Sequence, residues 1–285
     1  MLEMLMNPRK AERHPWELFF VGLFYASVSM FLVTWVFSGD AVLSKYSGIL
    51  LVLFAVMFSM PFMYYTMKLE EEKINSGTGT IALLKEHQKA IKAFLWLFLG
   101  FVVAFSFWFI AFDSNESFKA QIETFCVINR PSEVSNCVQQ YTTSQSTALT
   151  GSVTKEARLF LIFSNNIYVL IFTLLFSLVF GAGVIFVLAW NASVIAAAIG
   201  IFAQSKVEAI PLGLARYMIH GIPEIGAYFV VALAGGLVSI AVVKHETGTQ
   251  KFWEVLQDSL NLIITSIVIL FLAALVEVYV TPILF

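Results

Sequence analysis

Long apolar runs separated by short polar stretches are the dominant pattern of this chain. A helix that crosses a bilayer needs about 20 mostly apolar residues. The runs that meet this length are 18–37, 46–65, 93–112, two within 160–203, 222–243 and 260–281. The pattern therefore predicts an all-α fold, a polytopic bundle of about seven transmembrane helices.

The run 160–203 can be divided in two ways. It is too long for one span, and a tight cytoplasmic hairpin at Gly181 and Gly183 would give two spans and seven in total. Alternatively, one long helix reaches Trp190, and residues 191–202 form a re-entrant half-helix in a six-span protein. We favour seven spans, because that arrangement gathers the polar residues considered below.

Composition separates this chain from soluble proteins. Hydrophobic residues make up 59% and charged residues 13%, and the mean hydropathy is +0.83, whereas a soluble domain has roughly a quarter charged residues. A soluble fold of this composition would expose large apolar patches. The lipid bilayer is therefore the expected partner. A net charge of −2 offers no basic surface for nucleic acid.

Basic residues in short loops set the expected orientation. The segment before the first span has three, the loop 66–92 has five and the hairpin 38–45 has one. The N-terminus is therefore predicted to be cytoplasmic in the plasma membrane, with segment 113–158 outside the cell. The run 18–37 is too long for the core of a signal peptide, so we expect it to be retained as a span.

The predicted outer segment contains both cysteines, Cys126 and Cys137. A pair in one loop, on the side of the membrane where disulfides persist, favours a bridge. The alternative is two reduced thiols on the cytosolic side. Residues 139–154 are rich in Ser, Thr and Gln and carry no charge, which predicts an exposed, mobile loop.

Strongly polar side chains inside predicted spans are the candidates for function, because they are costly in hydrocarbon and usually face a bundle interior or an aqueous cavity. His220 and Glu224 are four positions apart and would share one helix face, with Pro223 in the first turn of its span. The candidates are Asn165, Asn166, Asn191, His220, Glu224 and Glu277.

A seven-span arrangement places most of these candidates at one depth. Asn165 and Asn166, the His220–Glu224 pair and Glu277 would all lie near the outer surface, whereas six spans would separate them. Such a layer predicts a polar pocket or a proton or ion site. The alternative is a hydrogen-bonded network that only fixes the helix register. The zinc pattern H-E-x-x-H is absent, and we predict neither a metal nor a cofactor.

Catalytic motifs do not stand out: the sequence has no Walker loop, nucleophile elbow, Cys-x-x-Cys or dinucleotide-binding turn. We therefore expect a protein that is not an enzyme. Four short motifs stand out in order along the last two-thirds of the chain: Asn165-Asn166-Ile167, Gly181-Ala182-Gly183 followed by Trp190-Asn191, His220-Gly221-Ile222-Pro223-Glu224, and Ala273-Ala274-Leu275-Val276-Glu277 ending in Thr281-Pro282. In these motifs residues 90–285, roughly, resemble the stage II sporulation protein M family. This family often has Pro before the His, where this chain has Ile219, a departure that bears on where the helix starts.

The resemblance implies one span, an external loop and four further spans in residues 93–285. Residues 1–92 would be an added N-terminal hairpin with a Lys-rich cytoplasmic loop. The founding member acts as a scaffold for peptidoglycan-degrading partners. The leading hypothesis is thus a scaffold or assembly factor in envelope or membrane remodelling, with membrane or envelope protein partners and homo-oligomers left open. The alternative is a transporter of a small solute, ion or proton that uses the His/Glu/Asn cluster; an intramembrane enzyme is a third, weaker reading.

Overall fold

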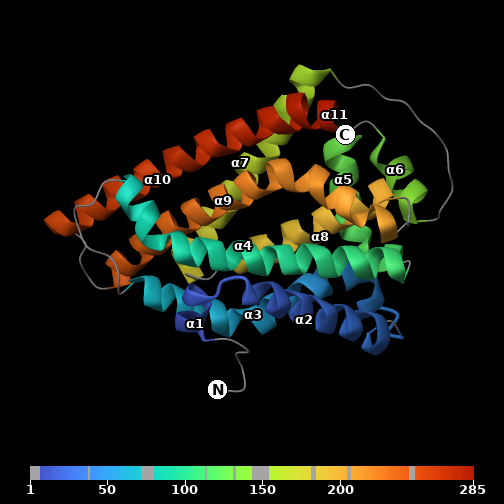
Figure 1. Ribbon diagram of the computed structural model, residues 1–285, viewed down its shortest axis with the longest axis horizontal. Coiled ribbons are helices and arrows are strands. Elements are labelled where there is room, and N and C mark those ends of the chain that lie inside the picture. The colour runs from blue at the N-terminus through green and yellow to red at the C-terminus, as the bar shows by residue number, and fades with distance from the viewer. Residues whose placement is uncertain are drawn as a thin grey trace.

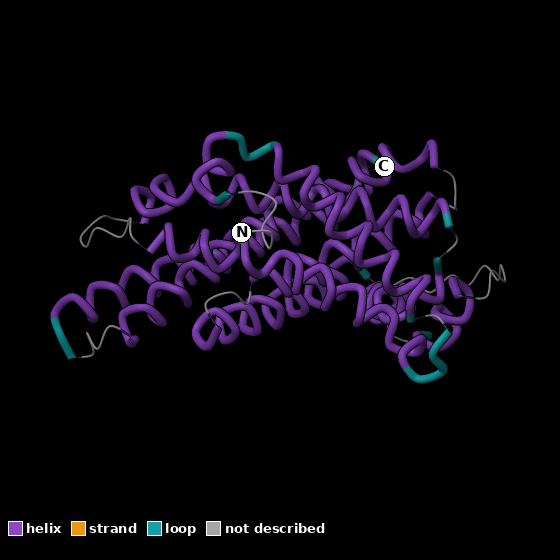
Figure 2. The backbone as a smooth tube through the Cα atoms, turned by 90° about the horizontal axis from the view of Figure 1, so that it is seen from below, coloured by secondary structure: helices purple, strands orange, loops and turns teal. Residues whose placement is uncertain are grey.

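The computed structural model describes residues 7–37, 39–71, 80–112, 114–130, 133–142, 154–180, 184–203, 207–243 and 248–285, and it contains no strand in them (Figure 1). Within these ranges, seven helical stretches are long and apolar enough to cross a membrane. The predicted all-α bundle of seven spans is therefore confirmed. Figure 2 shows that the long helices run roughly along the long axis of the molecule.

The described part of the chain forms eleven α-helices and five short 3-10 or π elements. In chain order they are α1 Pro8–Arg13, α2 Glu17–Phe31, η1 Leu32–Val36, η2 Leu43–Tyr46, α3 Ser47–Glu71, α4 Thr80–Ala111, η3 Asn115–Phe118, α5 Lys119–Asn129, α6 Val134–Thr142, α7 Lys155–Phe180, α8 Val184–Ala203, η4 Val207–Ala209, α9 Ile210–Val243, α10 Gln250–Leu275, η5 Val276–Val280 and α11 Thr281–Leu284.

The long apolar run contains two spans, as the seven-span reading predicts. α7 ends at Phe180 and α8 begins at Val184, so Trp190 and Asn191 lie within α8 and not at the end of one long helix. The re-entrant alternative is therefore wrong. The predicted glycine hairpin at 181–183 lies outside the described residues.

The sixth span differs from its predicted bounds. α9 begins at Ile210, not at residue 222, so Pro223 lies inside the helix and the prediction that it occupies the first turn is wrong. Ile219, at the position where the resembled family often has Pro, is also inside α9. The polar side chains of Arg216 and His220 lower the hydropathy of this first part. They face a cavity, however, so the helix continues through them.

Close approach of two helix backbones holds the N-terminal hairpin to the rest of the bundle. α2 packs along α4, and they meet where Gly22 faces Gly100. The turn between α2 and α3 is capped by Asp40, whose carboxylate accepts the backbone N–H groups of Leu43 and Val42 at 2.8 Å. Both bonds lower the pKa of Asp40, and the bond from the Leu43 N–H has the larger effect.

α9 is the central helix of the other part of the bundle, where it packs against α10, α7, α8 and α4. Large apolar side chains remain exposed on the outward faces of α2, α3, α7 and α10, among them Phe24, Leu53, Phe172 and Leu272. Patches of this kind are avoided by soluble proteins, and they are the surface that lipid covers in a membrane.

The predicted external loop contains a folded helical pair, α5 and α6, joined by a disulfide between Cys126 and Cys137. The predicted bridge is thus present, and the alternative of two free thiols is not. Gln121 of α5 is fully buried, and its amide donates to the Gly48 carbonyl oxygen at 2.7 Å and to Ser193 Oγ at 3.1 Å. These bonds fix α5 to α3 and α8. Most of the predicted mobile segment 139–154 lies outside the described residues.

Removing the disulfide is expected to destabilise this end of the bundle. Both cysteines are buried, so a Cys126→Ala, Cys137→Ala double variant avoids burying new hydroxyl groups. We expect a loss of about 2–4 kcal/mol, seen as a melting temperature several degrees lower in detergent. A reductant should lower the melting temperature of the wild type to that of the variant, without affecting the variant. Equal melting temperatures for the oxidised wild type and the variant would contradict this role.

Candidate polar cavity within the spanning helices

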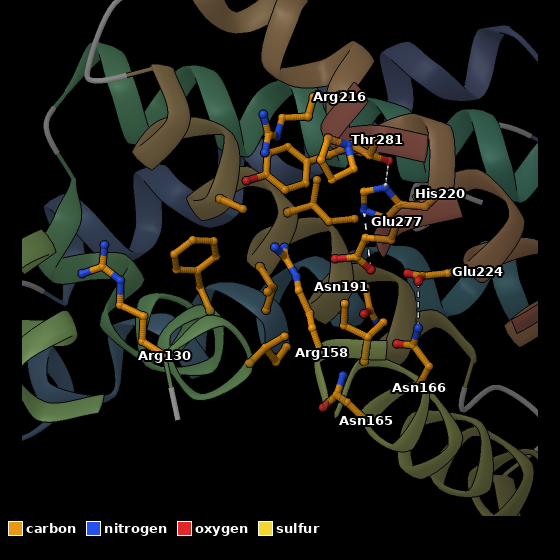
Figure 3. A pocket seen from close by; sticks show the side chains of 18 of the residues that line it. Arg130, Arg158, Asn165, Asn166, Asn191, Arg216, His220, Glu224, Glu277 and Thr281 are labelled. Carbon is orange, nitrogen blue, oxygen red and sulfur yellow. Dashed lines mark hydrogen bonds and ion pairs between the residues drawn. The ribbon is translucent and has the colours of Figure 1, made fainter. Parts of the chain in front are cut away.

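A cavity of about 350 Å³ lies among α7, α8, α9 and the C-terminal segment, next to the α5–α6 pair (Figure 3). Pockets that hold small ligands have volumes of roughly 300–1,000 Å³. All six polar residues singled out from the sequence line this cavity. The polar residues of its wall are Arg130, Tyr141, Arg158, Asn165, Asn166, Asn191, Arg216, Tyr217, His220, Glu224, Glu277 and Thr281.

A series of side-chain hydrogen bonds in the cavity wall joins α7 to α9. The Nδ2 of Asn166 donates to Glu224 Oε1 at 2.7 Å, and the Tyr228 hydroxyl donates to Asn166 Oδ1 at 3.0 Å. Asn166 is only 6% exposed. Its amide therefore bonds on both sides, which fixes its orientation and holds the Glu224 carboxylate at the cavity.

A second set of polar contacts joins α9 to the C-terminal segment, which consists of η5 and α11. His220 Nε2 lies 4.0 Å from Glu277 Oε2, and His220 Nδ1 lies 3.4 Å from Thr281 Oγ1. The His220 side chain is almost fully buried. His220 therefore pairs with Glu277 of another helix, while Glu224, its neighbour one turn along α9, bonds to Asn166.

Both carboxylates lie at irregularities in their helices. Glu224 follows Pro223, which has no N–H to donate to the carbonyl of Ile219 one turn earlier. Glu277 lies in the π-helical element η5, where the backbone N–H of Thr281 bonds to the Val276 carbonyl. Single π turns inside helices are frequent at functional sites, and interrupted helices form the binding sites of many transporters.

The remaining two predicted residues, Asn165 and Asn191, line the same cavity but take no part in these two sets of contacts. Asn191 bonds through Nδ2 to the carbonyl oxygen of Val187 in its own helix, at 2.8 Å. Asn165 stands beside Asn166 on α7 and faces the cavity (Figure 3). The structure thus brings all six residues to one cavity, from α7, α8, α9 and the C-terminal segment.

Three arginines in the cavity wall were not among the sequence candidates. Arg216 bonds to the Phe285 carbonyl oxygen at 3.4 Å and stacks over the Phe202 ring, and Arg130 bonds to Gln140 at 2.9 Å. Figure 3 shows Arg158 reaching from α7 toward Glu277, while Arg130 lies apart from the other labelled side chains. In the sequence these arginines lie outside the predicted spans, so they look like ordinary charged residues of loops.

The charges are ordered along the helix axes. At 1.5 Å per residue, Arg158 and Arg216 lie about 5 and 9 Å from the first residues of α7 and α9. Asn166 and Glu224 lie about 16 and 21 Å along the same two helices. The cavity therefore has Arg158 and Arg216 near the helix ends, with the Asn166 amide and the Glu224 carboxylate deeper in the bundle.

Metal binding has no geometric support in the described residues, where no group of three or more His, Cys, Asp or Glu side chains is arranged to hold an ion. His220 and Glu277 face each other and Glu224 bonds to Asn166, while the remaining polar groups of the wall are amides, hydroxyls and guanidinium groups. The wall is instead suited to hydrogen bonding and charge pairing with an organic solute.

Comparison with known proteins gives one family and one relative. The sequence model of the family described as Stage II sporulation protein M matches residues 49–282. An uncharacterized protein from Methanocaldococcus jannaschii is 32% identical over 124 residues, which are 42% of this chain and 69% of that protein. No solved structure matches. The family match begins inside α3, whereas the resemblance drawn from the four motifs begins near residue 90.

Proposed function

The chain belongs to the stage II sporulation protein M family, and from this starting point we propose that it is a membrane protein of the transporter class, which binds a small charged solute in its polar cavity. The family is one of membrane proteins, and its name assigns no chemistry to this chain. The proposal therefore rests on the cavity.

The single observation that supports it is a hollow lined by arginine, glutamate and histidine within the membrane-spanning helices. Ionisable groups in this position are costly and are usually found on substrate or ion pathways. If the network only held the helices together, we would expect it to be closely packed and to leave no cavity, because voids and unpaired charges both destabilise a bundle. A cavity of about 350 Å³ beside these charges instead fits a bound solute.

The order of the charges indicates the class of solute. Arg158 and Arg216 near the helix ends suit an acidic group, since guanidinium pairs with carboxylate in bidentate geometry. Glu224 deeper in the bundle, together with Glu277 opposite His220, suits an amino group. A small zwitterion with its amino end directed inward satisfies both sets, and free amino acids are the simplest probes of this class.

The test is binding and uptake of amino acids by the purified full chain. We expect one or more amino acids to raise its melting temperature in detergent and to enter liposomes that contain it, while citrate and spermidine, which carry one sign of charge, have little effect. Arg216→Gln should weaken binding about tenfold or more. Arg13→Gln, at an exposed site in α1, is the matched control. A wild type that neither binds nor transports any of these probes would refute the proposal.

A scaffold role in envelope or membrane remodelling is the second candidate. It is favoured by the disulfide-tied α5–α6 pair, which is fixed to the bundle through Gln121 and offers a firm surface to a protein partner. With the N-terminus in the cytoplasm, as the basic loops predict, this pair would face the outside of the plasma membrane. In the experiment above, stable co-purifying envelope proteins together with no solute binding would favour the scaffold.

A further inference from the structure

A second hollow, of about 280 Å³, lies between α4 and α9 and is almost entirely apolar. Its walls are formed by Leu95, Trp96 and Leu99 of α4 and by Met218 and Ile222 of α9, and Lys92 stands at one end. Trp96 and Ile222 are exposed, at 39% and 48%. The hollow is therefore a groove on the outer face of the bundle, and the polar cavity lies on the other side of α9, where His220 and Glu224 point.

Basic side chains continue the line of this groove along α4. Lys85, Lys89 and Lys92 follow one another at spacings of four and three residues, and Trp96 and Leu99 continue the same spacing. Residues so spaced share one face of a helix. The side chains of Lys85, Lys89 and Lys92 are all exposed, and that of Lys92 also lines the groove.

The depth of Lys92 matches a membrane surface. It lies about 28 Å along α4 from Ala111, which is close to the thickness of the hydrocarbon core. Lysines at this level extend their ammonium groups into the headgroup region while the carbon chain stays in the apolar layer. Tryptophan is also enriched at the interface, because its ring is amphipathic.

We propose that the groove binds one anionic phospholipid, with an acyl chain between α4 and α9 and the phosphate held by Lys85, Lys89 and Lys92. Three positive charges at the mouth of an apolar groove complement one negative headgroup attached to hydrocarbon. Basic sites between spanning helices on the cytoplasmic side bind anionic headgroups in this way. The site is separate from the polar cavity, and its existence does not depend on the proposed transport.

The first test is lipid retention by the full chain in native mass spectrometry. We expect phosphatidylglycerol to be retained on the order of tenfold more strongly than phosphatidylcholine, and the difference to disappear in a Lys85→Gln, Lys89→Gln, Lys92→Gln variant. The matched control removes three exposed lysines near the other end of the bundle, as Lys45→Gln, Lys119→Gln, Lys155→Gln. Equal retention of both lipids by the wild type, or unchanged selectivity in the first variant, overturns the proposal.

The second test locates the acyl chain and separates lipid from free phosphate. Phosphatidylglycerol with brominated chains should quench tryptophan fluorescence in liposomes, and Trp96→Phe should remove a distinct part of that quenching. Excess inorganic phosphate added to the sample should not displace the lipid, as measured by native mass spectrometry, because phosphate has no acyl chain to fill the groove. Displacement by phosphate, or quenching that is the same without Trp96, overturns the assignment of the groove. If the triple variant does not fold, Lys92→Gln alone replaces it.

Discussion

Replacing Gly100 with alanine is expected to separate α2 from α4 and to leave little folded protein. A Cβ atom at Gly100 would overlap the carbonyl oxygen of Phe19 and lie 3.0 Å from the Cα of Gly22. These are backbone atoms, so no side chain can rotate away to make room. Membrane helices use small residues for such close contacts. We expect a loss of about 3 kcal/mol or more, seen as aggregation or a strongly lowered melting temperature in detergent.

Gly226→Ala is the matched control for this prediction. Gly226 also lies inside a long spanning helix, α9, but nothing lies within 4 Å of an added Cβ atom there. Alanine has the higher helix propensity by about 1 kcal/mol, so this variant should melt at the wild-type temperature or slightly above it. If the two variants behaved alike, the close contact between α2 and α4 would not be what holds the N-terminal hairpin in place.

Most of the fold can be read from the sequence because hydrocarbon leaves few choices to a polypeptide. Backbone polar groups inside a bilayer must be satisfied within the segment, so a long apolar run becomes a helix. Run length therefore indicates how many helices there are, and seven are found in the described residues. Helix ends are harder to predict, as α9 illustrates: its first twelve residues include Arg216 and His220 and look too polar for a span.

The candidate site was accessible from the sequence only in part. Asn166, His220, Glu224 and Glu277 stand out because polar residues are rare in apolar runs. Tyr228 does not stand out, although it follows Glu224 at the same four-residue spacing that links Glu224 to His220. The arginines could not be assigned to the cavity, because only the tertiary packing shows that the first turns of α7 and α9 turn their faces toward it.

The division of the chain at residue 92 stays a prediction. α4 crosses that position without interruption, from Thr80 to Ala111, and α2 packs on α4 through Gly22. The family match includes residues from 49 onward, which takes in most of α3. An N-terminal hairpin added to an older five-span unit would have to be fitted closely to α4, and the glycine contact is where that fit is tightest.

Glu224→Gln is expected to weaken solute binding strongly while the bundle remains folded. Glutamine keeps an Oε1 atom that can accept the 2.7 Å bond from Asn166 Nδ2, so the link between α7 and α9 is preserved. Only the charge is lost. Removing one partner of a buried charge pair costs about 2–5 kcal/mol, so amino-acid binding should weaken at least about 30-fold, measured by titration calorimetry and by uptake into liposomes.

Two further variants serve as a second test and as a control for this prediction. Glu277→Gln removes the other carboxylate and should weaken binding to a similar degree, since His220 and Glu277 face the same cavity. Glu116→Gln, an exposed site in η3, should bind like the wild type. If Glu224→Gln and Glu277→Gln bound and transported the solute normally, the carboxylates would only join the helices. Their effect would then appear in the melting temperature alone, and the cavity would have to bind its solute through the arginines.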